Sequence, residues 1–159
     1  MPRYIAPWEG YTSSHYEKYP LVMVCPHMRF SYHTHYDNKS PWLDEIPVHR
    51  VIKDNYAWWP IRMQPDDARK RGINHGDIVK VYNDRGAILG VAQLTERVKE
   101  GTIFTYQAGA KYDPLEPGKA GSIDRGGVAN LLTPSKMVSP NAPGMACNST
   151  CVEVEKWEG

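Results

Sequence analysis

The alternation of apolar and polar residues predicts several short strands and few helices. The continuous apolar run from Leu21 to Val24 is typical of a strand that is buried on both faces, and it ends before Pro26. Residues 102–106 indicate another strand, and residues 151–157 alternate cleanly, as a last strand with one buried face does. A shorter alternating segment lies around Val48 to Ile52, between prolines.

The middle of the chain predicts a short helix followed by a hairpin. Pro65 suits the first helical position, because its missing N–H would have no partner there. Acidic residues follow it and basic residues end the helix, as the helix dipole favours. Gly72 ends the helix, since glycine tolerates the left-handed conformation at that point. The hairpin then comprises a strand that begins at Ile78, a turn at residues 83–86 and a returning strand at residues 87–94.

Other segments lack a regular pattern. Residues 1–20 are aromatic and polar, and we expect an N-terminal arm there that either lies across a neighbouring surface or frays, ahead of a barrel domain at residues 21–159. Residues 107–127 are too rich in glycine and proline for a regular element, and ordered loops of that length are usually functional. Residues 135–145 are also expected to be irregular.

These elements predict a small, mainly β barrel with one or two short helices and long loops. Two of the loops, Cys25–Asn38 and Gln107–Asn130, are polar or glycine-rich, and we expect them to converge at one rim of the barrel. The glycine pair at residues 126–127 allows the backbone to approach a neighbour closely. The tryptophan pair at residues 58–59 is expected to pack in the core, with stacking on a ligand as the alternative.

Composition and charge exclude some classes of protein. The 159 residues are enough for one domain with a hydrophobic core. The 19 basic and 18 acidic residues give a net charge of +1, which offers no electrostatic case for a nucleic-acid partner. No apolar run reaches the roughly 18 residues of a membrane span, and no signal-peptide pattern opens the chain. The sequence therefore leaves the compartment open and favours the cytoplasm only slightly.

Candidate metal ligands do not form a recognisable site. The three cysteines are an odd number, which argues against a disulfide framework, so buried thiols are expected. The CxxxC spacing of Cys147 and Cys151 is a weak metal signal without further ligands, even if Cys25 is added. The alternative of a histidine-based metallohydrolase rests on His27, His33 and His35.

Three stretches of the chain carry recognisable motifs. The first is LVMVCPHMRFSYHT, in which a strand leads to an aromatic residue and a His-Thr pair. The second is MQPDDARKRGINHGDIVKVYNDRGAILGVAQLTERVKEG, and the third is ANLLT with the closing strand CVEVEKW. Together they resemble the C-terminal domain of the molybdopterin oxidoreductases, the dimethyl-sulfoxide-reductase family of molybdenum and tungsten enzymes. The resemblance implies a six-stranded double-psi β-barrel that binds molybdopterin guanine dinucleotide.

The resemblance also implies which residues contact this cofactor. His33 and Thr34 match a His-Thr pair that contacts the pterin and its phosphates, Tyr32 stands at an aromatic position beside them, and Asn130 matches an asparagine before a Leu-Thr pair. His27 stands where many members have arginine, Arg29 follows two residues later, and Asn148 lies near a position that is commonly lysine. No catalytic and no metal-ligating residue is implied in this chain.

The resemblance further implies that the chain is incomplete as a catalyst. In the family the metal ligand, the substrate pocket and most of the grip on the cofactor belong to other domains. We therefore expect the chain alone to be inactive and its partners to be the remaining domains or subunits of a molybdenum or tungsten oxidoreductase. The details resemble most the large subunits of transhydroxylase-type enzymes acting on polyhydroxylated aromatics. The alternative is a docking barrel that contacts a partner protein through its arm and its tyrosine and tryptophan surface and binds no nucleotide.

Overall fold

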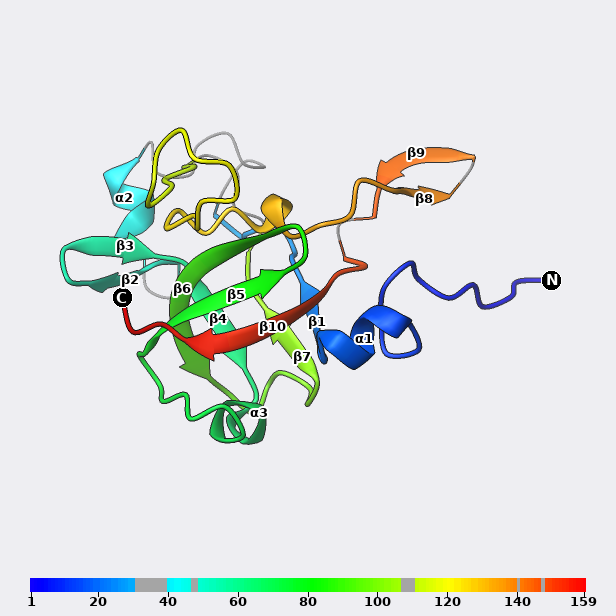
Figure 1. Cartoon of the computed structure of the whole chain (residues 1–159), viewed down its shortest axis with the longest axis horizontal. Helices are drawn as coiled ribbons and strands as arrows, with labels where there is room; N and C mark the ends of the chain where they lie inside the picture. Colours follow the sequence, from blue (N-terminus) through cyan, green and yellow to red (C-terminus); the bar gives the residue numbers. More distant parts are fainter. Residues whose placement is uncertain (31–39, 47–48, 107–110, 140, 147) are drawn as a thin grey trace.

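The centre of the molecule is a closed barrel of six strands. The computed structural model describes residues 1–30, 40–46, 49–106, 111–139, 141–146 and 148–159. The strand order around the barrel is β1-β10-β5-β6-β4-β7 (Figure 1). The six strands are β1 (Leu21–Val24), β4 (Pro60–Met63), β5 (Ile78–Asn83), β6 (Gly86–Leu94), β7 (Thr102–Phe104) and β10 (Cys151–Lys156). The prediction of a mainly β, six-stranded barrel is confirmed.

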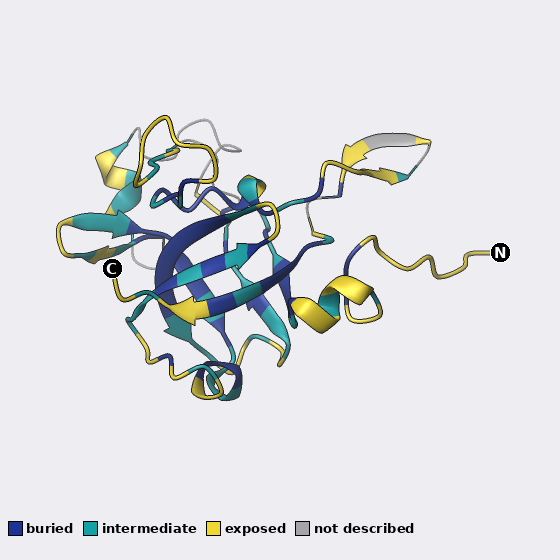
Figure 2. Ribbon diagram, viewed as in Figure 1, coloured by how far each residue is buried: buried dark blue, intermediate teal, exposed yellow. Residues whose placement is uncertain are grey.

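The strand pairings mix the two directions. β5 and β6 form the expected antiparallel hairpin, and β10 pairs antiparallel with both β5 and β1. β1 pairs parallel with β7, and β4 pairs parallel with β6. The inward-facing side chains of all six strands form the main core cluster, whose barrel members include Leu21, Met23, Ile61, Met63, Val79, Val81, Ile88, Ile103, Val152 and Val154. Figure 2 shows these strands as mostly buried, while residues 1–8 are exposed.

β6 is buried on both faces for most of its length. Its inner face lies in the main core, and on its outer face Leu89 and Val91 pack with Trp58 of β3 (Tyr56–Trp58). Its Gly90 is needed because a Cβ atom there would lie 2.6 Å from the Ile61 side chain and 2.8 Å from the Trp59 carbonyl oxygen. The barrel therefore has an outer layer over β6, and the candidate site is built in that layer.

The predicted helix is α3 (Pro65–Arg69). Gln64 caps it, since the Gln64 side chain accepts a hydrogen bond from the Asp66 N–H. Gly72 has a φ of 64°, the left-handed conformation expected after a helix. Both the helix and its termination are confirmed.

Several short elements were not predicted. The structure contains α1 (Ser14–Lys18), α2 (Pro41–Asp44), the 3-10 turn η1 (Ala129–Leu131) and two small hairpins, β2 (Val51–Lys53) with β3 and β8 (Met137–Ser139) with β9 (Ala142–Met145). The prediction that residues 135–145 are irregular was wrong, because β8 pairs with β9 although the residues of β8 lack the alternating burial that would mark a strand in the sequence. No helix in the described part of the chain is long and apolar enough to cross a membrane.

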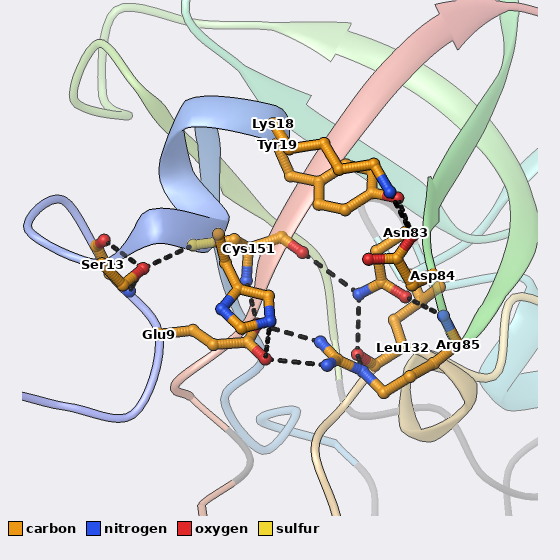
Figure 3. Close-up of polar contacts among 11 residues, drawn as sticks. Glu9, Ser13, Lys18, Tyr19, Asn83, Asp84, Arg85, Leu132 and Cys151 are labelled. Atoms are coloured by element: carbon orange, nitrogen blue, oxygen red, sulfur yellow. Dashed lines mark hydrogen bonds and ion pairs between the residues drawn. The ribbon is translucent and has the colours of Figure 1, made fainter.

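The N-terminal segment is extended only in part, because it contains α1 and a buried anchor at Glu9. The Glu9 carboxylate accepts two hydrogen bonds from Arg85, at 2.7 and 2.9 Å, and one from the Cys151 N–H at 2.8 Å (Figure 3). Tyr19 donates to Asp84 at 2.6 Å from the end of the same segment. Residues 9–19 therefore lie on the barrel's own hairpin and β10, while the division of the chain at residue 20 stays a prediction.

Candidate functional site

The two candidate loops meet on Trp59. Met28 of the first loop packs against the Trp59 side chain, and so does Tyr106, which leads into the second loop. Gly127, at the far end of the second loop, has a φ of 76°, and a Cβ atom there would lie 2.5 Å from Trp59 Cδ1. Trp59 is only 1% exposed, so its predicted place in the core is confirmed. The predicted convergence of the loops holds for the residues that the structure describes.

A buried carboxylate shapes the second loop. Asp124 is fully buried, and its side chain accepts hydrogen bonds from the N–H groups of Asp113 at 2.7 Å, Gly126 at 3.0 Å and Val128 at 2.7 Å. Its own backbone is bonded to β6, since Asp124 N–H donates to Ala87 at 3.0 Å and its carbonyl accepts from Leu89. One side chain thus closes the loop and attaches it to the barrel.

A second polar cluster ties this loop to β3. Asp113 accepts from the Tyr56 hydroxyl at 2.8 Å and from Arg125 Nε at 3.0 Å, and the Arg125 guanidinium lies 4.5 Å from the centre of the Tyr56 ring. Burial raises the pKa of Tyr56, and the hydrogen bond to Asp113 raises it further. Burial also opposes ionisation of Asp113, but the bonds from Tyr56 and Arg125 outweigh it and leave the pKa lowered. The cluster therefore keeps Asp113 charged and the loop fixed.

The end of this loop, η1, is held from its other side by the β5–β6 turn. The Leu132 carbonyl oxygen accepts from the Asn83 side chain at 2.9 Å and from Arg85 Nε at 2.6 Å (Figure 3). Asn83 also donates to the Cys151 carbonyl at 3.1 Å. Between these bonds and those of Asp124, η1 presents Asn130 as an exposed residue. The hydrogen bonds on both sides of η1 therefore fix the backbone of Asn130, the residue that the sequence motif selects.

The first loop is joined to the segment before β10 by a predicted site residue. Asn148 Oδ1 accepts the Cys25 N–H at 2.9 Å, so this side chain connects the exit of β1 to the entry of β10. Its side-chain nitrogen keeps two N–H donors for another partner. Asn148 is thus both a structural link and an available donor beside the first loop.

Only some of the remaining predicted site residues lie in the described part of the chain. His27 and Arg29 are exposed, and the Arg29 guanidinium lies 5.4 Å from the centre of the Phe30 ring. Tyr32, His33 and Thr34 lie outside the described residues, as do His35 and Cys147. The described donors are a guanidinium, an imidazole and two amides, a set that suits the phosphates and polar ring edges of a dinucleotide. In chemical terms these residues fit the implied cofactor, although their role in binding it stays a prediction.

A buried histidine beside the first loop was not predicted from the sequence. His49 is 2% exposed and lies 5.7 Å from the Trp59 ring, centre to centre. The next residue, Arg50, is buried as well, with its guanidinium 3.3 Å from the centre of the Trp59 ring and 3.4 Å from the Asp44 carboxylate. Burial lowers the pKa of His49 and the Arg50 charge lowers it further, against the weaker effect of Asp44. No spacing in the sequence marks this pair.

The thiols offer no metal site in the described part of the chain. Cys25 and Cys151 are buried thiols, and burial raises the pKa of the Cys151 thiol. Among the described residues, no three histidine, cysteine, aspartate or glutamate side chains are grouped closely enough to hold a metal ion.

Comparisons with known proteins agree with the fold and with the motifs. Residues 21–151 match the family model described as "Molydopterin dinucleotide binding domain". The chain is 47% identical over 161 residues to the pyrogallol hydroxytransferase large subunit of Pelobacter acidigallici, and the match covers 100% of this chain and 18% of that protein. It is 32% identical over 162 residues to the trimethylamine-N-oxide reductase of Haemophilus influenzae, with 99% of this chain and 18% of the reductase covered.

A solved structure has the same fold. Acetylene hydratase from Pelobacter acetylenicus superposes with a TM-score of 0.70 at 15% sequence identity, over 99% of this chain and 21% of that one. The chain thus spans about a fifth of the length of these proteins. Because the family model extends from the first residue of β1 to the first residue of β10, the chain belongs to the family of molybdopterin dinucleotide-binding domains of molybdenum oxidoreductases.

Proposed function

We propose that this barrel seats molybdopterin guanine dinucleotide in a molybdenum or tungsten oxidoreductase of the transhydroxylase type. The observation that carries the proposal is the framework around η1, in which Asp124 on one side and Asn83 with Arg85 on the other fix the segment that bears Asn130. A side chain on a backbone that is already fixed loses less conformational entropy when it binds an anionic group than one on a mobile loop. The 47% identity to a pyrogallol hydroxytransferase large subunit supports the enzyme type.

In this proposal the chain binds and positions, while other parts of the enzyme complete the reaction centre. The cofactor, when bound, supplies the metal centre at which the substrate reacts. Asn130, Asn148, His27 and Arg29 donate hydrogen bonds to the phosphates and polar ring edges, together with Tyr32, His33 and Thr34 from the resembling motif. Each bond to a charged group contributes roughly 1.5–3 kcal/mol.

The partner in this proposal is the rest of the same oxidoreductase. The hairpin of β8 and β9 projects away from the barrel on the side from which the N-terminal segment also extends (Figure 1). The two are joined, since Trp8 Nε1 donates to the Met137 carbonyl at 2.8 Å. They expose the large apolar side chains of Tyr4, Ile5, Trp8, Met137, Val138 and Met145, which we name the hairpin surface. We propose that the remaining domains or subunits cover it, as exposed apolar patches of this kind mark contact sites.

The test of cofactor binding uses the assembled enzyme that contains this barrel. Purified enzyme is analysed for guanine nucleotide released by hydrolysis, for pterin and for metal. Asn130→Ala and His33→Ala are expected to weaken cofactor retention by about 10- to 150-fold each, the equivalent of one hydrogen bond to a charged group. The matched control is Asn74→Ala, an exposed asparagine between α3 and β5, which should retain the cofactor normally. Unchanged pterin, nucleotide and metal in both test variants would contradict the proposal.

A further inference from the structure

A small cavity lies between the starts of the two candidate loops. It has a volume of about 160 Å³ and is lined by Met28, Arg29, Phe30, His49 and Tyr106. Three of these residues belong to the first loop, and Tyr106 directly follows Thr105, whose N–H is bonded to the last residue of β1. At roughly 30 Å³ for each water molecule, the volume corresponds to about five waters. The cavity therefore admits one ring system and not a whole dinucleotide.

His49 lines this cavity, and its ring nitrogens lack hydrogen-bond partners in the described part of the chain. Neither its Nδ1 nor its Nε2 atom has a hydrogen-bond partner among the residues that the structure describes, although the side chain is almost fully buried. Buried polar groups without partners are uncommon in folded proteins, and each one calls for an explanation such as a bound molecule. A ligand that bonds to the ring would remove this cost.

The charge state of His49 indicates what that ligand offers. Burial and the neighbouring Arg50 lower the pKa of His49, so the ring is neutral near pH 7. A neutral imidazole has one N–H donor and one acceptor nitrogen, and it is satisfied by a molecule that brings both an acceptor and a donor. Arg29 and the buried Arg50 disfavour a cation in this place.

The other walls favour a flat ring. Tyr106 and Phe30 contribute aromatic surfaces, and Met28 contributes an adaptable apolar one. Trp59 lies behind them, 6.1 Å from Tyr106 and 5.7 Å from His49 between ring centres. Aromatic walls with a neutral donor and acceptor at one end suit a planar heterocycle that carries C=O and N–H groups along one edge.

We propose that His49 binds the lactam edge of a fused heterocycle inserted into this cavity, the chemistry shared by the pterin and guanine ends of the dinucleotide. This inference rests on the proposed function, since it assumes that the dinucleotide is present. It adds a residue that neither the motifs nor the comparisons select, and it places one ring of the cofactor against Tyr106 rather than on the barrel surface.

The experiment measures how fast the assembled enzyme loses its cofactor. Purified enzyme is diluted into urea below the unfolding transition, and the released pterin and guanine nucleotide are followed with time. His49→Phe, which removes both hydrogen bonds, is expected to speed release by about tenfold or more. His49→Gln keeps a donor and an acceptor near the position of Nε2 and should stay within about threefold of the wild type. The control is His75→Phe, at an exposed histidine outside the cavity.

A second form of the enzyme distinguishes the two ends of the cofactor. Enzyme loaded with molybdopterin that lacks the nucleotide is compared with enzyme loaded with the dinucleotide. If His49 binds the pterin, His49→Phe speeds release of both forms. If it binds guanine, only the dinucleotide is released faster. Either result supports the inference.

The inference and the proposed function fail in different ways. A wild-type enzyme that contains no molybdopterin dinucleotide would refute both. A wild-type enzyme that contains it, with release from His49→Phe at the wild-type rate, would refute only the inference and leave water as the occupant of the cavity. If His49→Phe does not assemble, Phe30→Trp fills the cavity from its exposed side and leaves His49 unchanged. Normal cofactor retention in Phe30→Trp would then also refute the inference.

Discussion

Replacing Asp124 by asparagine should destabilise the chain and disturb the site together. The Asp124 carboxylate accepts three backbone hydrogen bonds at 2.7, 3.0 and 2.7 Å in a fully buried position. An amide oxygen can still accept from Asp113 and Gly126, but each bond to a neutral acceptor is weaker by roughly 0.5–1 kcal/mol. The Val128 N–H then faces the NH2 group, and a buried donor left without a partner costs roughly 1–3 kcal/mol.

The two weakened bonds and the unpaired Val128 N–H together lower the free energy of unfolding by about 3 kcal/mol. The sum lies in the lower part of its range because the neutral asparagine avoids the cost of burying a charge. With a urea dependence of roughly 1.5 kcal/mol per molar, the midpoint of urea unfolding should fall by about 2 M. The assay is urea unfolding of the 159-residue chain followed by tryptophan fluorescence.

The matched control is Glu116→Gln in the same loop. Glu116 pairs with Lys119 at the surface, where both side chains are more than half exposed, so its replacement should change stability by less than about 0.5 kcal/mol. A loss of less than about 1 kcal/mol for Asp124→Asn would show that the loop does not depend on these three bonds. In the assembled enzyme Asp124→Asn should also weaken cofactor retention, because Val128 leads directly into η1 and Asn130.

Three further predictions concern other parts of the chain. Burial opposes ionisation of Glu9, but the hydrogen bonds to its carboxylate outweigh burial and lower its pKa below 4.5. The free energy of unfolding should therefore decrease as the pH falls below that value, and Glu9→Gln should make this decrease shallower. Equal slopes for the two proteins would disprove the prediction. Gly127→Ala should cost about 2 kcal/mol or more in urea unfolding, through its positive φ and its contact with Trp59, whereas Gly118→Ala, with a φ of 82° and open space around it, should cost only the backbone strain of about 1 kcal/mol. Val138→Ser on the hairpin surface should leave the stability of the chain within about 0.5 kcal/mol and reduce its recovery in the assembled enzyme, and full recovery would argue against contact there.

Elements with strong local signals were predictable from the sequence. α3 and the β5–β6 hairpin depend on a proline, a glycine and turn residues within a few positions of one another, so a single sequence contains the information. β4 was missed because Pro60–Met63 has no alternating pattern and gains its structure from distant partners, β6 on one side and β7 on the other. The β2–β3 hairpin has a local signal that was overlooked, since Asp54 and Asn55, with φ values of 52° and 57°, are residues that tolerate this conformation.

In the candidate site, only the residues that belong to recognisable motifs could be predicted from the sequence. Asn130 and Asn148 could be selected by resemblance, and the structure shows what holds each of them in place. Nothing in the sequence distinguishes Asp124 from other acidic loop residues, because its role depends on three backbone N–H groups that the fold brings to its carboxylate. His49 likewise becomes a candidate only when burial removes its access to water, and burial depends on Trp59 and on the first loop together.

The pairing of β1 with β10 determines when this protein can be completed during biosynthesis. The two strands close the barrel, and Asn148 joins the same ends through the Cys25 N–H. Most of the chain separates them, so at an elongation rate of about 5–20 residues per second the first strand waits on the order of ten seconds for its last partner. During that interval its apolar side chains lack a closed barrel to cover them. The barrel, and with it the frame of η1 to which the Cys151 carbonyl contributes, is therefore complete only after β10 has been translated.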